Sequence, residues 1–395
     1  MDRRRFLRMA VVRGAAGLSA SEAMSAVFAQ ARSAQVPPAQ PHAAQVHAPA
    51  TPSRTRHIER FAKRLDLIRQ SLDVPGMSVA VLHKQAVLLA RGFGVADVAA
   101  RTRATESTPY PIASVTKTFA TAVIMKLVEQ GKLDLDEPVS SYDHDYAQWC
   151  ASLKTLNGAA SVRGYSCDTA RITLRHHLTH TAQGTPGANF EYNAFLFGRL
   201  TAVIDAVSPR GYQRSLEEDI LDPLGMKDTA LGTKDSNKPA VVARMAKPYR
   251  LDADGNLSES GAGRSFDRIS ASSGIISTVA DLARYDVGID HDLVYSPQAK
   301  QQVWTPAVTR SGAALPYGLG WFVQGEPGGK GQFVWHYGQY PSAFSSLLFK
   351  VPDRHLTFIF LACTERASSV FSLGNGDPLR SAFVSAFVDE FAGYS

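Results

Sequence analysis

The sequence predicts a mixed α/β fold in which both ends of the chain contribute strands to one β-sheet. Two observations lead to this expectation. Residues 76–97 and 343–363 each hold two β-rich runs separated by a short polar turn, which is the pattern of a β-hairpin. The part of the chain between these hairpins is helix-rich, so it is expected to form a helical insertion beside the sheet.

The remaining elements follow from apolar spacing and stop signals. Residues 58–72 place apolar side chains on one helical face, and the Asp-Val-Pro-Gly sequence at 73–76 ends that helix. Behind Ser114, apolar side chains recur at every fourth position on several faces, which predicts a deeply packed helix that Gly131 terminates. Residues 381–392 repeat phenylalanine at i+4 and predict a terminal helix.

Composition and charge exclude some classes of protein. The chain has 395 residues, of which 45% are hydrophobic and 20% charged, as in ordinary globular proteins. Residues 1–31 contain five arginines and two acidic residues, so they carry three of the six net positive charges. The remaining charge is spread along the chain without a basic stripe, which argues against nucleic-acid binding.

The first 31 residues have the pattern of an export signal. Twin arginines precede Phe6-Leu7, as in twin-arginine signals, and Ala29-Gln30-Ala31 offers small residues for a signal peptidase. Residues 32–55 are rich in Ala and Pro and are expected to be a flexible linker. We therefore expect a periplasmic or secreted protein, and no later stretch is apolar enough to span a bilayer.

Three cysteines are too few for a fold built on disulfides. Cys150 and Cys167 lie in a polar, loop-like stretch and could form a disulfide in an oxidising compartment. Cys363 ends an apolar run, where it is expected to be a small buried side chain.

Ser114 lies three residues before Lys117, at the start of the apolar helix. Residues i and i+3 share a helical face, so the lysine amine can reach the serine hydroxyl. The positive end of the helix and burial both lower the pKa of a lysine and favour a neutral amine that accepts a proton. The alternative, a serine cap followed by a solvated lysine, fits poorly with a helix that is apolar on most faces.

Three stretches extend this pair into a known pattern. Ser114-Val115-Thr116-Lys117 resembles the S-x-x-K motif of serine β-lactamases and penicillin-binding proteins. Tyr192 stands where that family has the Tyr of Y-x-N, and His336-Tyr337-Gly338 resembles its K-T-G motif in an H-x-G form. The resemblance covers roughly residues 56–395 and is greatest to the class C group, with its β-lactamases, DD-carboxypeptidases, D-aminopeptidases and esterases.

The resemblance implies a largely antiparallel sheet flanked by helices, with an all-helical subdomain formed by residues 136–266. Residues 56–135 and 267–395 would then form the α/β domain. The family needs no cofactor and acts on small ester, amide or D-amino-acid peptide substrates. We therefore expect a small-molecule substrate, no nucleic-acid partner and a monomer.

The resemblance also implies roles for individual residues. Ser114 would be the nucleophile and Lys117 its proton acceptor, while Tyr192 would relay protons to the leaving group and from water. The backbone N–H groups of Ser114 and Gln339 would form the oxyanion hole. The segment His336-Tyr337-Gly338 would bind the substrate, with the histidine orienting it or holding Tyr192. Which of Lys117 and Tyr192 takes the first proton is left open by the sequence.

The sequence departs from the family pattern at Ala194, where the Asn of Y-x-N is expected and Asn193 precedes it. An alanine can neither support the lysine nor donate to a substrate carbonyl, and His336 removes a permanent cation. The sequence therefore favours an esterase or peptidase-like hydrolase. The alternatives are a true class C β-lactamase and a penicillin-binding sensor that does not turn over.

Three histidines in residues 176–180 include an H-x-x-x-H spacing. Metalloprotease chemistry requires a glutamate directly after the first histidine, and His176 is not followed by one, so we expect no metal site there. A metal-dependent hydrolase would instead lose its activity in the presence of a chelator.

Overall fold

The computed structural model describes residues 52–153, 165–263, 269–329 and 331–391. All of these described residues belong to one compact unit. The predicted export signal lies outside the described residues, as does most of the predicted linker. The predicted linker extended to residue 55, but helix α2 already begins at Pro52.

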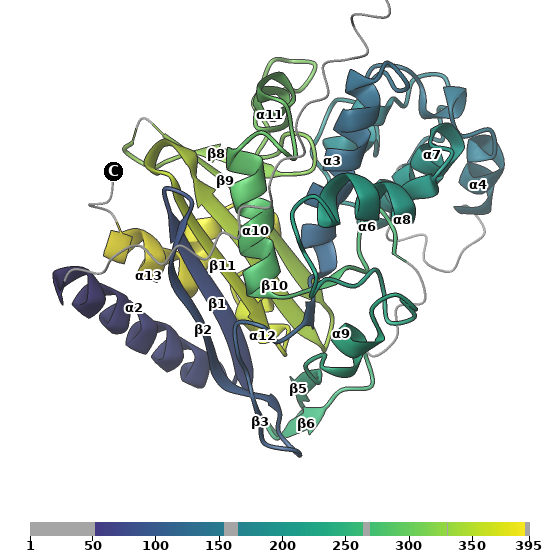
Figure 1. The fold of residues 1–395 in the computed structure, drawn as a ribbon. Coiled ribbons are helices and arrows are strands. Elements are labelled where there is room, and N and C mark those ends of the chain that lie inside the picture. Colours follow the sequence, from purple (N-terminus) through teal and green to yellow (C-terminus); the bar gives the residue numbers. More distant parts are fainter. Residues whose placement is uncertain (1–51, 154–164, 264–268, 330, 392–395) are drawn as a thin grey trace, which may run out of the picture. The chain divides into compact units, whose positions relative to one another are not determined.

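The central feature is a seven-stranded sheet, and it is antiparallel, as the resemblance implied. Its strands, in their order across the sheet, are β3 (Thr102–Arg103), β2 (Ala86–Asp97), β1 (Gly76–His83), β11 (Leu356–Ala362), β10 (Phe344–Val351), β9 (Gln332–Tyr340) and β8 (Phe322–Gly325). Figure 1 shows β1, near the N-terminal end of the colour scale, lying beside β11, near its C-terminal end. Both predicted hairpins are present, and the β1–β11 pairing joins the two ends of the chain in one sheet.

The central strands are apolar on both faces because helices cover both sides of the sheet. Every residue of β10 and β11 is buried. On β1, Val79 and Val81 join the cluster that packs under α2, whereas Ala80 and Leu82 join the opposite cluster. A continuous apolar run is the pattern expected of a strand with both faces buried.

One face of the sheet is covered by the helices from the two ends of the described chain, α2 (Pro52–Ser71) and α13 (Ala382–Phe391). Phe61 on α2 contacts Phe391 on α13 at 5.2 Å between ring centroids and Phe358 on β11 at 5.8 Å. The phenylalanine repeat that predicted the terminal helix therefore packs against the sheet and the first helix.

The other face is covered by α10 (Val279–Asp290), and α3 (Thr116–Glu129) belongs to the same buried cluster. Phe119 and Tyr285 stack at 3.9 Å and join the two helices. Helix α3 is buried over most of its length, and Gly131 follows it with a φ of 67°, as expected for a helix-terminating glycine. Ser114 lies in a 3-10 turn at Ala113–Val115 that leads directly into α3, and the α-helix itself begins two residues later, at Thr116.

Residues 136–266 contribute no strand to the large sheet in their described part. Their helices are α4 (Tyr146–Leu153), α5 (Leu174–Leu178), α6 (Ala194–Gly198), α7 (Leu200–Val207), α8 (Gly211–Leu216) and α9 (Pro239–Ala243). The segment is not wholly helical, because β5 (Tyr249–Leu251) and β6 (Leu257–Glu259) form a small hairpin. The exact domain boundaries remain a prediction. Two further helices are α11 (Pro297–Val303) and α12 (Arg366–Ser369).

Cys150 and Cys167 form a disulfide with a Cα–Cα distance of 5.7 Å, which confirms the predicted pairing. Cys150 lies on helix α4 and not in a loop, as the sequence had suggested. Cys363 is buried and free, as predicted. Among the described residues, no helix has the length and apolar character needed to cross a membrane.

Candidate active site

Ser114 lies in a tight turn that two neighbouring segments hold in place. Ala113, just before it, has a φ of 45°, which is an unfavourable conformation for a residue with a side chain. The Ile112 N–H donates to the Ile275 carbonyl at 2.9 Å, and the Ser346 hydroxyl donates to the Ile112 carbonyl at 2.6 Å. Strained backbone of this kind persists where surrounding contacts enforce it, and it is frequent at functional sites.

Strand β9 approaches the serine turn closely at Gly338. A Cβ atom added at this glycine would lie 2.3 Å from the Ile112 carbonyl oxygen and 3.0 Å from the Ala113 Cβ. Only glycine therefore allows this strand to lie against the turn that carries Ser114. The absence of a side chain at Gly338 permits this close approach, and the substrate-binding role that the resemblance suggested for it remains a prediction.

Lys117 begins the first turn of α3 and is wholly buried. Its Nζ lies 3.0 Å from the Ser114 hydroxyl oxygen and donates a hydrogen bond to the Ser272 carbonyl at 3.1 Å. Burial lowers the pKa of Lys117 to about 7, so a substantial fraction of the amine is neutral at neutral pH. The serine and the lysine are thus close enough to exchange a proton.

Aromatic rings surround the Lys117 amine. Its Nζ lies 5.0 Å from the centroid of the Tyr192 ring and 5.3 Å from that of Phe197. No carboxylate among the described residues forms an ion pair with this lysine, and burial is the cause of its low pKa. Without a counter-ion, the protonated form has only ring faces and the two oxygen atoms to stabilise it.

Tyr192 lies beside the pair, and its hydroxyl oxygen is inaccessible and has no hydrogen-bond partner among the described residues. Burial raises the pKa of Tyr192 well above 10.0, and the neighbouring Tyr337 adds to this effect, while the nearby Ser114 hydroxyl acts in the opposite direction. Tyr192 therefore keeps its proton at neutral pH and is a donor or relay.

The departure at Ala194 has a structural consequence. Ala194 is exposed and begins helix α6, while Asn193 is the N-cap of that helix and accepts hydrogen bonds from the Phe195 and Leu196 N–H groups at 3.0 Å. Asn193 therefore does not replace the missing amide at Lys117. The second acceptor for the lysine is a backbone carbonyl, that of Ser272.

His336 does not fill the role that the resemblance implied. The ring is fully buried, its Nδ1–H donates to the Tyr337 carbonyl at 2.7 Å, and its Nε2 accepts from the Tyr317 hydroxyl at 2.9 Å. Both nitrogens are occupied, so the histidine is available neither to the Tyr192 hydroxyl nor to a substrate. Burial lowers the pKa of His336 to about 3, and the nearby Lys117 lowers it further, which keeps the ring neutral.

The remaining predicted residues lie along the second half of β9. Strand β8 pairs with β9 only as far as Trp335, so no described strand covers the edge of the stretch from His336 to Tyr340. Alternate N–H groups of such an edge point away from the neighbouring strand β10. This arrangement suits the predicted oxyanion role of the Gln339 N–H, which remains a prediction. The Gln339 side chain donates to Glu365 at 3.1 Å.

The three histidines of residues 176–180 have separate partners. His176 Nδ1 accepts from the Thr173 N–H at 3.1 Å, and His177 bonds to the Tyr146 hydroxyl and the Leu196 carbonyl, both at 2.8 Å. His180 Nδ1 accepts from the Asn193 N–H at 3.1 Å. The sequence reasoning assigned His180 no function, and it missed Ser272 as well.

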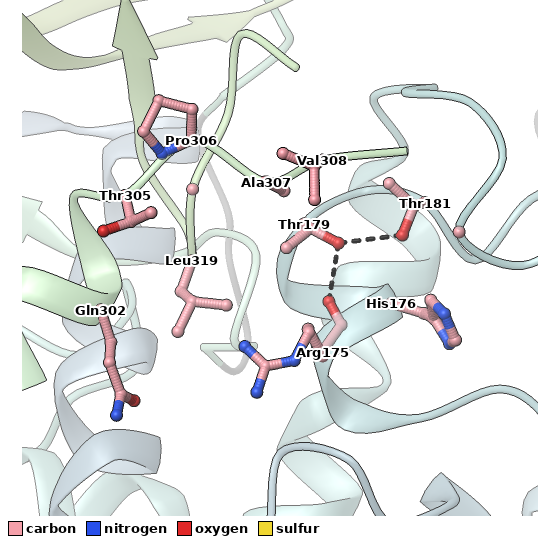
Figure 2. A pocket seen from close by; sticks show the side chains of 12 residues that line it. Arg175, His176, Thr179, Thr181, Gln302, Thr305, Pro306, Ala307, Val308 and Leu319 are labelled. Atoms are coloured by element: carbon pink, nitrogen blue, oxygen red, sulfur yellow. Dashed lines mark hydrogen bonds between the residues drawn. The ribbon is translucent and has the colours of Figure 1, made fainter. Parts of the chain in front are cut away.

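A cavity of about 340 Å³ is lined in part by Thr179 and Thr181, the two neighbours of His180 in the sequence (Figure 2). None of the proposed catalytic side chains lines it. Its lining residues are Arg175, His176, Thr179, Thr181, Gly187, Gln302, Thr305, Pro306, Ala307, Val308, Gly318 and Leu319. Figure 2 shows Thr179 bonded to Thr181 and to the Arg175 carbonyl, at 2.9 and 2.8 Å. His180 lies between the two threonines in sequence but does not line the cavity. Its ring packs instead against Tyr192.

Comparisons with known proteins show which family and fold the chain resembles. Residues 64–371 match the family model described as Beta-lactamase. Protein flp of Staphylococcus aureus (strain NCTC 8325 / PS 47) is 28% identical over 175 residues, which are 40% of this chain and 35% of that protein. The matched part thus spans about a third of the length of this curated relative.

Solved structures show the same fold. The octameric penicillin-binding protein homologue from Pyrococcus abyssi matches with a TM-score of 0.67 and 22% identity, over 84% of this chain and 77% of that chain. The D-amino acid amidase from Ochrobactrum anthropi SV3, complexed with L-phenylalanine amide, matches with a TM-score of 0.62 and 19% identity, over 85% of this chain and 99% of that chain. At these identities the likeness concerns the fold alone.

Proposed function

The chain belongs to the Beta-lactamase family, and we propose that it is a serine hydrolase that forms an acyl-enzyme at Ser114. The observation that carries this proposal is the 3.0 Å distance between the Ser114 hydroxyl and the buried amine of Lys117. A neutral amine at this distance can take the hydroxyl proton as the oxygen attacks a carbonyl carbon.

In the first half-reaction, Lys117 takes the proton because its pKa is about 7, whereas Tyr192 keeps its own proton. The serine oxygen bonds to the carbonyl carbon, and the oxyanion forms beside the Ser114 and Gln339 N–H groups. Tyr192 then gives its proton to the leaving group as the bond between the carbonyl carbon and the leaving group breaks. Lys117 passes the proton that it took from Ser114 to Tyr192. In the second half-reaction, water attacks the acyl group, and its proton restores the Ser114 hydroxyl.

The substrate we propose is a small ester or amide that lacks a carboxylate next to the scissile bond. His336 supports this choice, because it is neutral and both of its nitrogens are occupied, so it offers no cation to an anionic substrate. The missing amide at Ala194 points in the same direction. Efficient β-lactam hydrolysis, in contrast, would need a substitute for both features.

The test is a substrate panel on the wild type and Ser114→Ala. We expect turnover of short p-nitrophenyl esters or D-amino-acid anilides to exceed that of nitrocefin, and Ser114→Ala to lose it. Intact mass after a fluorophosphonate should increase by one adduct in the wild type alone. A penicillin adduct that persists without any turnover would instead indicate a sensor, and full activity of Ser114→Ala would refute the proposal.

We also propose that the protein is exported, as its first 31 residues suggested. The Cys150–Cys167 disulfide supports this proposal, because such bonds persist mainly in oxidising compartments. Replacing both arginines at positions 4 and 5 by lysine should retain the protein in the cytoplasm, as cell fractionation would measure. Unchanged export of that variant would exclude the twin-arginine route.

A further inference from the structure

We propose that His180 is a positioning residue that holds Tyr192 beside Ser114 and Lys117. This inference rests on the proposed function, since it concerns how the proton relay of that site is kept in place. The sequence analysis excluded a metal site at His180 and assigned this residue no catalytic or binding role.

His180 binds the chain on both sides of Tyr192. Its carbonyl oxygen accepts from the Glu191 N–H at 2.8 Å, and its ring Nδ1 accepts from the Asn193 N–H at 3.1 Å. His180 has a φ of 55°, a left-handed conformation in which its carbonyl and its ring bond the same short segment. One residue therefore anchors the residues that immediately precede and follow Tyr192.

The ring of His180 also touches Tyr192 directly. The two ring centroids are 4.3 Å apart, and the Tyr317 ring lies 4.9 Å from the imidazole. His180 is 3% exposed, so its ring leaves the tyrosine little space in which to change its orientation. Since Tyr192 has no hydrogen bond from its own hydroxyl among the described residues, ring packing and the backbone bonds determine its position.

Gln183, on the same turn, makes a second connection between the same two neighbours. Its Nε2 donates to the Glu191 carboxylate at 2.9 Å, and its Oε1 accepts from the Asn193 side-chain amide at 2.9 Å. The segment from His180 to Gln183 thus makes four hydrogen bonds to Glu191 and Asn193. These bonds hold both neighbours of Tyr192, and none of them reaches Lys117.

The state of the ring suits this role. Because Nδ1 accepts a hydrogen bond, the neutral ring carries its proton on Nε2. Burial holds the pKa of His180 well below 6.5, and the nearby Lys117, His336 and His177 lower it further. A neutral imidazole adds no positive charge beside the lysine, which must itself become positive when it takes the serine proton.

Two substitutions separate the features of His180. His180→Asn keeps an acceptor atom near the Nδ1 position and tolerates a positive φ, but removes the ring. His180→Phe keeps a ring and removes the acceptor, which leaves the buried Asn193 N–H unpaired. Because a misplacement of about 1 Å can lower a rate about 100-fold, we expect kcat of His180→Phe to fall about 10–100-fold, with KM within about twofold. His180→Asn should keep kcat within about fivefold.

His177→Asn is the matched control. His177 is as deeply buried as His180, and its two ring nitrogens bond to Tyr146 and Leu196, outside the proposed site, whereas His180 Nε2 has no hydrogen-bond partner among the described residues. Its substitution should lower the melting temperature and leave kcat of the folded protein within about threefold. All variants are compared below their melting temperatures, with circular dichroism to show that they are folded.

The decisive measurement is a double-mutant cycle with Tyr192→Phe. If His180 acts through Tyr192, the double variant His180→Phe/Tyr192→Phe should be no slower than Tyr192→Phe alone. Losses that multiply in the double variant, or equal losses for His180→Asn and His180→Phe, would overturn the inference. Full activity of Ser114→Ala would instead refute the proposed function, so the two failures can be told apart.

Discussion

Replacing Lys117 by methionine should abolish activity and at the same time stabilise the fold at neutral pH. The lysine is wholly buried, and its only polar contacts in the described residues are the Ser114 hydroxyl and the Ser272 carbonyl. Methionine has a similar length and no charge, so it can fill the same space between Tyr192 and Phe197. Loss of the proton acceptor should lower kcat by about 10²–10⁴-fold.

The size of the stability gain follows from the pKa of Lys117. Lowering that pKa from 10.5 to about 7 corresponds to roughly 4 kcal/mol of lost stability at pH 7, at about 1.4 kcal/mol for each pH unit. Methionine removes this cost but leaves the Ser272 carbonyl unpaired, which costs about 1–3 kcal/mol. We therefore expect the free energy of unfolding of Lys117→Met to exceed that of the wild type by about 1–3 kcal/mol at pH 7.

The direction in which the stability difference between the two proteins changes with pH tests this reasoning. Between pH 7 and 10.5, the unfolded chain binds a proton at Lys117 that the folded protein does not bind, so wild-type stability rises with pH. Methionine does not titrate. The advantage of Lys117→Met should therefore shrink by about 3 kcal/mol between pH 7 and about 9.5.

Urea unfolding of both proteins at these two pH values, with turnover of a p-nitrophenyl ester in parallel, measures both effects. Lys126→Met, on the more exposed side of the same helix, controls for the loss of a lysine from α3. The reasoning is refuted if Lys117→Met is destabilised equally at both pH values, or if it keeps more than about a tenth of the wild-type kcat.

Three further predictions concern the pH profile, the glycine of β9 and the disulfide. The acid limb of kcat/KM should have a midpoint near pH 7, because protonated Lys117 cannot accept the Ser114 proton, and a flat profile from pH 5 to 9 would contradict this. Gly338→Ala should lower both stability and kcat, because its Cβ would lie 2.2 Å from the Ser346 hydroxyl, whereas Gly325→Ala, with nothing within 4 Å, should change neither. Thermal unfolding and ester turnover of the two variants measure this difference. The Cys150–Cys167 disulfide closes a loop over a sequence separation of 17, so its reduction should lower the free energy of unfolding by about 3 kcal/mol. Urea unfolding with and without a reductant measures this loss, and an unchanged free energy of unfolding would contradict the prediction.

Secondary-structure elements could be predicted from the amino-acid sequence wherever a short stretch of residues specifies them. Hairpins, helices and their stops follow from apolar period and turn residues within short windows, and these predictions held at both ends of the chain. The Ser114–Lys117 proximity belongs to the same class, because three residues within one turn leave little freedom. The linker boundary and the start of α3 were misplaced by a few residues, since helix ends have weak signals.

The groups that surround Ser114 and Lys117 became known only from the three-dimensional packing. The Ser272 carbonyl reaches Lys117 across 155 residues, and a backbone oxygen has no signature in the sequence. His336 matched a motif position, yet its partners Tyr317 and the Tyr337 carbonyl make it part of the interior. His180 acts through the backbone on both sides of Tyr192. Contacts of this kind arise from packing between distant segments, so side-chain identity along the chain could not predict them.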